Sequence, residues 1–300
     1  MEVLRGETIK KEKRKETSLS RNFLTRKFLF RLDKELCTGC GICAQVCPKE
    51  AIEEKQPLVV NGRLKKKPTI DIDPNKCIFC GECVVLCPYN ALKMKVDGEE
   101  TTNVVKNEAF PVLLKEIKVN MKVCYFQPDC NLECQESCPT ESIKAEAKRS
   151  ENGKILRVTK MKIDEPLCLY CKVCESACPL GAIHVKKPLQ GTIEVNADLC
   201  PEGCRACVDI CRTHAIELGE NGKPLVSPEF CLFCSACQKV CPKDAIKVRR
   251  SWVYHSDIKA AAWLTALKKL TSTETVVREL QVKSAKNRVS AVKKRRLSEI

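Results

Sequence analysis

The cysteines constrain this chain more than any other feature, because all 24 fall into six groups of four with none left over. Four groups, the first, second, fourth and sixth, share the spacing C-x2-C-x2-C-x3-C-P. The third and fifth groups keep four cysteines at altered spacing. In chain order, groups one to six comprise Cys37, Cys40, Cys43 and Cys47; Cys77, Cys80, Cys83 and Cys87; Cys124, Cys130, Cys134 and Cys138; Cys168, Cys171, Cys174 and Cys178; Cys200, Cys204, Cys207 and Cys211; and Cys231, Cys234, Cys237 and Cys241.

The shared spacing indicates iron–sulfur clusters. Three thiolates at intervals of three residues let a tight loop surround one [4Fe–4S] cluster, and the fourth cysteine, about one helical turn further on, points toward a second cluster. Zinc ribbons instead pair cysteines two and two across a gap of about 12–20 residues. We therefore predict that all 24 cysteines are metal ligands and that the cofactors are six [4Fe–4S] clusters.

The two deviating groups still supply four thiolates each. Group three has a longer first loop that carries Tyr125, Phe126 and Pro128. The first three cysteines of group five match the C-x3-C-x2-C loop of radical SAM enzymes, which leave one iron open. Against that reading, Cys211 lies at the ferredoxin distance, Ala206 stands where that family usually has an aromatic residue, and no barrel-sized domain follows. We expect a complete cluster at both groups.

The sequence shows no targeting or membrane segment. Its first residues are charged and contain no apolar stretch that could act as a signal peptide. The longest apolar patch with a helical pattern, residues 260–264, is far shorter than the roughly 20 residues needed to span a bilayer. We expect a cytoplasmic protein with no membrane span, in which thiols stay reduced and disulfides are disfavoured.

Strand-like pieces flank the cysteine groups, as in Thr69–Asp73 and Thr192–Val195. The expected fold is α+β: three tandem two-cluster ferredoxin modules built from neighbouring groups. Groups four and five are separated by 21 residues and groups five and six by 19, so insertion of one module within another also fits. The predicted divisions are a basic flexible tail at 1–26, modules at 27–100, 101–190 and 191–250, and a basic helical extension at 251–300.

The C-terminal extension reads as helical. Ser256 can cap a helix through Trp263 and Leu267, and Thr271 with Glu274 forms a capping-box pattern before a further apolar run. Such helices either fold back on the ferredoxin modules or dock a partner subunit. Both alternatives remain open.

The net charge of +15 suggests a nucleic-acid partner, but the clusters change it. Each oxidised cluster with its four thiolates carries about −2, so six clusters bring the chain to about +3. Aromatic residues that could stack on bases are few. We expect the basic flanks to contact the anionic modules or an acidic protein partner, and we expect no nucleic acid.

The segments Arg31–Cys43 and Ile70–Cys77 resemble the polyferredoxins of methanogenic and related archaea, and look most like the polyferredoxin subunit of formylmethanofuran dehydrogenases. The resemblance covers about residues 27–250, although that family usually has eight cysteine groups. It implies an electron-transfer subunit with no catalytic residue of its own. Low-potential electrons would pass to catalytic and ferredoxin-like partner subunits that reduce carbon dioxide to a formyl group at a tungsten or molybdenum site.

Two alternatives remain. The chain could be the polyferredoxin of an energy-converting hydrogenase or of another anaerobic oxidoreductase. From a different class, the basic tails, including Lys293–Arg296, would suit a zinc-dependent nucleic-acid-binding protein.

Overall fold

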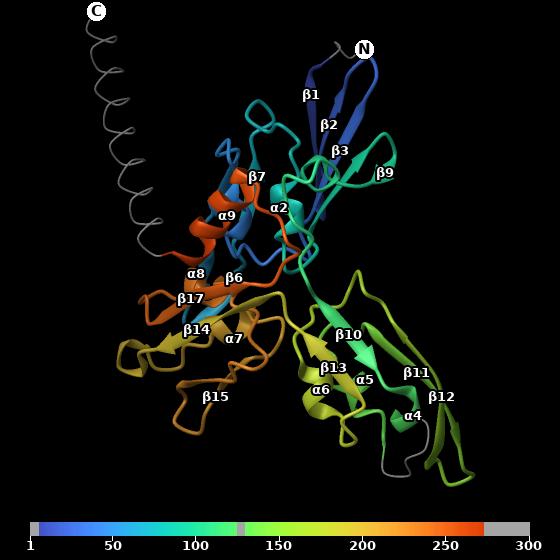
Figure 1. Cartoon of the computed structure of the whole chain (residues 1–300). Helices are drawn as coiled ribbons and strands as arrows, with labels where there is room; N and C mark the ends of the chain where they lie inside the picture. The colour runs from blue at the N-terminus through green and yellow to red at the C-terminus, as the bar shows by residue number, and fades with distance from the viewer. Residues whose placement is uncertain (1–5, 125–129, 273–300) are drawn as a thin grey trace, which may run out of the picture.

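Each pair of neighbouring cysteine groups builds one small α+β module in the computed structural model, which describes residues 6–124 and 130–272 (Figure 1). The strand before the first group pairs with the strand after the second, and the strand that follows the first group pairs with the strand that precedes the second. The outer pairs are β3 (Lys27–Asp33) with β8 (Leu92–Val96), β10 (Glu116–Val119) with β13 (Ile183–Lys186), and β14 (Leu189–Val195) with β17 (Ile246–Val253). The inner pairs are β4 (Ile52–Lys55) with β7 (Thr69–Ile72), β11 (Ile143–Arg149) with β12 (Ile155–Ile163), and β15 (Ile216–Leu218) with β16 (Pro224–Val226). The predicted tandem ferredoxin fold is confirmed.

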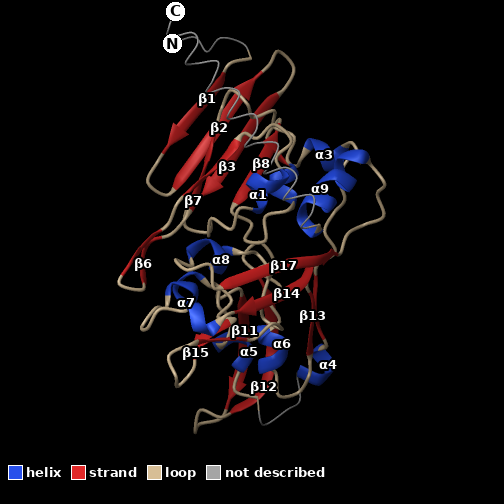
Figure 2. Cartoon of the chain, turned by 90° about the vertical axis from the view of Figure 1, so that its left-hand side faces the viewer, coloured by secondary structure: helices blue, strands red, loops and turns tan. Residues whose placement is uncertain are grey.

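A short helix carries the third cysteine of every group (Figure 2). In five groups the residue two positions before that cysteine has a positive φ, which turns the loop into the helix. This residue is Gly41 in group one and Gly81 in group two, with φ of 83° and 95°. Each helix is short, and in five groups a proline follows the fourth cysteine. The helices are α1 (Ile42–Val46), α2 (Glu82–Val85), α5 (Glu133–Glu136), α6 (Val173–Ala177), α7 (Ala206–Ile210) and α8 (Ala236–Val240).

The N-terminal segment is not the flexible tail that the sequence suggested. Strands β1 (Thr8–Glu12) and β2 (Glu16–Asn22) form a hairpin, and β2 pairs with β3, giving a five-stranded sheet in the order β1-β2-β3-β8-β9, with β9 at Glu99–Glu100. Leu19 is fully buried in the core of module 1, and Lys10 Nζ lies 2.5 Å from Asp71 Oδ1 on β7. Every second residue of β2 faces the core, although the segment as a whole is polar. The prediction of a flexible tail considered only the charge and was therefore wrong.

Shorter elements complete the fold. The hairpin of β5 (Leu58–Val60) and β6 (Arg63–Lys66) extends from module 1 to module 3, where the Gly62 carbonyl accepts a hydrogen bond from Arg205 N at 2.8 Å. The remaining elements are α3 (Asn103–Lys106), α4 (Met121–Cys124) and the 3-10 turn Ala197–Leu199. Within the described residues, no helix has the length and apolar character required to cross a membrane.

The C-terminal helix α9 (Ala261–Thr271) follows module 3 and packs both on β17 of that module and on α1 of module 1 (Figure 1). Its buried face, Trp263, Ala266 and Leu270, joins a core with Phe110 and residues of α1 and α2. Folding back is therefore the outcome for this helix. Ser256 does not cap it: α9 begins after Ala260, and the Ser256 hydroxyl accepts a hydrogen bond from Val112 N. The helix expected after Thr271 lies outside the described residues.

Candidate metal centres

The fourth cysteine of each group lies with the first three cysteines of its partner group. In every module one cavity shows this exchange directly. The cavities are lined by Cys77, Cys80 and Cys83 with Cys47; by Cys168, Cys171 and Cys174 with Cys138; and by Cys231, Cys234 and Cys237 with Cys211. We number these sites two, four and six, after the group that supplies three thiols.

The other half of each module follows the same rule. Cys87 is a close neighbour of Cys40 and Cys43, Cys178 of Cys124 and Cys134, and Cys241 of Cys200. These sets are sites one, three and five. Neighbouring groups thus pair one with two, three with four and five with six, and insertion of one module within another does not occur.

The cavities suit a polynuclear cluster better than a single ion. Zinc needs four ligands about 2–2.3 Å from one point. Among the described residues, no three or more His, Cys, Asp or Glu side chains are arranged to hold a single metal ion. The four thiols of site two instead surround a space otherwise closed by apolar side chains such as Phe30, Ile72 and Phe79. This donor set and this space between the sulfurs fit a [4Fe–4S] cluster.

Backbone amides point at the sulfurs at two recurring positions. The residue two after the first cysteine, held at positive φ, donates from Gly39, Tyr170 and Phe233 to Cys37, Cys168 and Cys231 Sγ at 3.3–3.4 Å. A second turn follows the fourth cysteine, where the third residue has a positive φ in all six groups. The amides of Ala51, Ala182 and Ala245 then reach Cys47, Cys178 and Cys241 Sγ at 3.2–3.4 Å. Such donors stabilise negative charge on a thiolate-bound cluster.

Burial sets the protonation of the metal-free thiols. It raises the pKa of Cys134, Cys174, Cys207 and Cys231 to about 12, so metal loading has to displace their protons. Cys138 is an exception. Burial raises its pKa as well, but hydrogen bonds from the Ser142 side chain and from neighbouring groups outweigh this and leave the pKa below its usual value.

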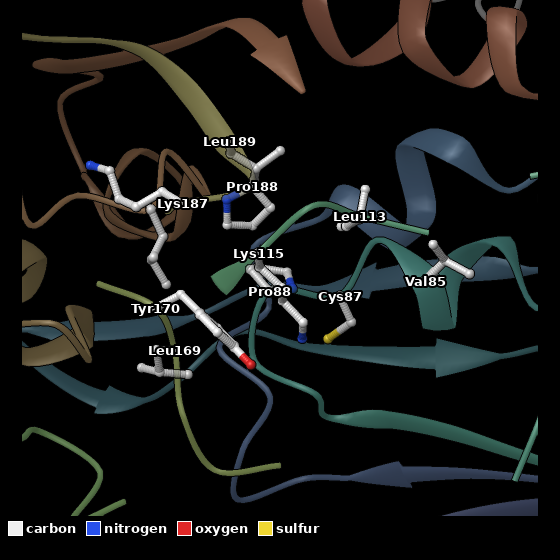
Figure 3. A pocket seen from close by; sticks show the side chains of 11 residues that line it. Val85, Cys87, Pro88, Leu113, Lys115, Leu169, Tyr170, Lys187, Pro188 and Leu189 are labelled. Carbon is white, nitrogen blue, oxygen red and sulfur yellow. The ribbon is translucent and has the colours of Figure 1, made fainter. Parts of the chain in front are cut away.

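The three modules meet at one junction (Figure 3). A cavity there is lined by Cys87 and Pro88 of module 1, Leu169 and Tyr170 of module 2, and Leu232 of module 3, among others. The buried core of module 1, which surrounds both of its sites, also includes Cys171 of site four, and Cys234 of site six packs against it. Cys40 of site one is a close neighbour of Cys234. Sites one, four and six therefore face the junction. No cysteine of sites two, three and five lines this cavity, and we refer to these three as the outer sites.

The comparisons with known proteins agree with this architecture. The model of the 4Fe-4S dicluster domain matches residues 36–91, 76–142, 124–182 and 199–245, which together cover more than half of the chain. The chain belongs to this family. It is a polyferredoxin, a chain in which the 4Fe-4S dicluster module is repeated.

The relatives of the polyferredoxin include both small ferredoxins and longer proteins. It is 44% identical over 59 residues to ferredoxin-1 of Rhodobacter capsulatus, covering 18% of this chain and 85% of that protein. It is 34% identical over 94 residues to the polyferredoxin protein MvhB of Methanothermus fervidus, covering 29% of this chain and 22% of the relative. The matches with the first curated relatives span only 12% to 22% of their length.

A solved structure matches nearly the whole polyferredoxin. One chain of the formate dehydrogenase–heterodisulfide reductase–formylmethanofuran dehydrogenase complex from Methanospirillum hungatei superposes with a TM-score of 0.75 at 30% identity. The match covers 90% of this chain and 93% of that chain. The structural similarity to that chain thus extends over all three modules.

Sequence analysis missed two lysines of the polyferredoxin junction. Lys115 Nζ lies 5.0 Å from the centroid of the Tyr170 ring; burial lowers its pKa, while neighbouring Cys168 and Cys87 oppose the fall (Figure 3). Lys187 Nζ donates to the carbonyls of Glu229 and Cys231 at 2.7 and 3.1 Å. Both lysines lie in segments between modules, and in the sequence nothing separates them from the many exposed lysines.

Proposed function

We propose that this polyferredoxin holds six [4Fe–4S] clusters through its 24 cysteines and relays low-potential electrons between subunits of an oxidoreductase complex, with no catalytic site of its own. Each cluster supplies one-electron redox chemistry when bound. The chain's part is to hold the thiolates, to aim amide donors at them and to keep water from the junction. The convergence of sites one, four and six carries this proposal, because it connects all three modules internally.

We further propose that the electron path between the three modules is branched. In a linear relay, the middle module would contact one module on either side, and the two end modules would not contact each other. Here one site of each module faces a common junction, and no cysteine of the other site lines the junction cavity. An electron that enters at site two, three or five can therefore leave through either of the other two modules.

We propose formylmethanofuran dehydrogenase as the catalytic partner, in a cytoplasmic complex. The support is the sequence resemblance together with the near full-length match to a chain of a complex whose title names that enzyme. A zinc-dependent nucleic-acid binder is disfavoured by sites that surround a space instead of converging on one ion.

Electron transfer to the catalytic subunits tests the proposal. The full chain is loaded with clusters, reduced anaerobically and mixed with formylmethanofuran dehydrogenase catalytic subunits, with the visible cluster absorbance as the readout. We expect reoxidation when carbon dioxide and methanofuran are both present, and none when either is omitted. A fully reduced chain that stays reduced with both substrates, or that is reoxidised only by hydrogenase subunits, contradicts this assignment.

A further inference from the structure

Tyr89 crosses from module 1 into module 3. It lies two residues after Cys87, a thiol of site one, and its side chain is buried. Its hydroxyl donates a hydrogen bond to Cys234 Sγ, a thiol of site six, at 3.0 Å. Tyr89 also lines the cavity of site six. The covalent path from Cys87 through Pro88 to Tyr89, followed by one hydrogen bond, thus joins a thiol of site one to a thiol of site six.

This tyrosine is specific to one module boundary. The corresponding position, two residues after the fourth cysteine, holds Lys49, Thr140, Leu180, Thr213 and Lys243 in the other five groups. The repeat therefore does not require an aromatic hydroxyl there. The phenol hydroxyl carries a proton that it can donate, and the sulfur of Cys234 is the acceptor that it faces.

Arg250 places a positive charge at the same boundary. Its guanidinium donates to the Phe233 carbonyl at 3.1 Å and the Ser235 hydroxyl at 3.0 Å, on either side of Cys234, and to Gln45 Oε1 at 2.7 Å. Gln45 lies on α1 between Cys43 and Cys47. These acceptors are neutral, so none of them cancels the charge of Arg250, and the guanidinium lies close to Cys40 of site one and Cys234 of site six. The charge is thus directed at site one and site six together.

We propose that Tyr89 and Arg250 form the electron-transfer contact between modules 1 and 3 and raise the reduction potentials of sites one and six above those of the outer sites. The inference rests on the proposed function, since it concerns the clusters that these sites would hold. One electron passes from the reduced site to the oxidised one, so that the first is oxidised as the second is reduced. No bond breaks, and Tyr89 keeps its proton.

The direction of the effect follows from charge. Reduction makes a cluster more negative, so a hydrogen bond to its sulfur and a nearby cation both favour the reduced form. A hydrogen bond to a charged group is enough to change an equilibrium constant about tenfold, which for one electron corresponds to about 59 mV. The first electron added to the chain therefore settles at the boundary between modules 1 and 3, from which the outer sites are reached.

The test uses the full, cluster-loaded chain reduced by about one electron. Electron–nuclear double resonance in water and in deuterium oxide should detect exchangeable protons coupled to the unpaired electron. Tyr89→Phe should remove one of these couplings and leave those of the backbone amides, such as Ala236 N on Cys234 Sγ, in place. A redox titration of Tyr89→Phe should show a first midpoint potential below that of the unaltered chain. The shift should correspond to about a tenfold smaller equilibrium constant for reduction. Tyr254→Phe is the matched control, because it removes a hydroxyl bonded to Gln190 at 2.7 Å without touching a site.

Arg250 gives a second, independent arm. Arg250→Met should lower the first midpoint, and Arg250→Lys should restore most of the loss because it returns the charge. If Arg250→Met binds less iron, its titration cannot be compared with that of the unaltered chain. Tyr89→Phe then tests the inference by itself, because it removes only one oxygen atom and leaves the packing of the ring in place. Full iron content with an unchanged titration in Tyr89→Phe, or a first electron without the tyrosine proton coupling in the unaltered chain, overturns the inference. Failure of the proposed function looks different: the unaltered chain would hold little iron and sulfide or no reducible centre.

Discussion

Helix α9 joins the end of module 3 to module 1, and Trp263 is its anchor. The side chain is fully buried, packs edge-on against Phe110 with ring centroids 5.2 Å apart, and donates from Nε1 to His255 Nε2 at 3.4 Å. Trp263→Ala removes this packing at a cost of about 3–5 kcal/mol. An isolated helix of 11 residues is not stable in water, so the loss should appear as local opening of α9.

Hydrogen exchange on the loaded chain measures that opening. At about 1.4 kcal/mol per factor of ten, the α9 amides should exchange at least a hundredfold faster in Trp263→Ala. The matched control is Leu264→Ala, because Leu264 is 45% exposed on the same helix and should change exchange little. Unchanged protection of α9 in Trp263→Ala would refute the view that this contact holds the helix on module 1.

Three further changes test the sites. Cys47→Ser should make the first three thiols of group two accessible to alkylation, and Cys87→Ser should do the same for the first three thiols of group one. Mass spectrometry maps the alkylated cysteines. Alkylation within the mutated group itself would contradict the assignment of each fourth cysteine to the partner group's site. Gly39→Ala should speed iron release to a chelator, since a Cβ there would lie 2.5 Å from the Pro68 carbonyl, whereas Gly98→Ala meets no atom within 4 Å and costs only about 1–2 kcal/mol of backbone strain. Iron-free chain should show no cooperative transition by calorimetry, because cluster binding supplies the folding energy; a sharp transition would contradict this.

The cysteine spacing predicted the modules because ligand geometry is local. Within eleven positions such as 37–47, the interval between thiols fixes the loop, the short helix and the direction of the fourth cysteine. The strands followed from the alternation around each group, as in β7 and β14. Pairing of neighbouring groups stayed open in the sequence, because 21 and 19 residues are similar lengths of chain. Only the tertiary structure resolves that choice.

Contacts between modules could not be predicted in the same way. Tyr89 and Cys234 are 145 positions apart, and nothing in either local pattern indicates the other. The N-terminal hairpin was missed because its buried residues, Thr17 and Leu19, are few among charged neighbours. Nothing in the sequence distinguishes Arg250 from adjacent cations such as Arg249, yet its contacts place it between two sites.

Counting metal, sulfide and electrons on one anaerobic preparation tests the central claim most directly. Six [4Fe–4S] clusters predict about 24 iron atoms and about 24 acid-labile sulfides per chain, and coulometric reduction that takes up about six electrons. Stoichiometric zinc with little sulfide, or an electron count well below the number of cysteine groups in a fully loaded chain, would contradict it.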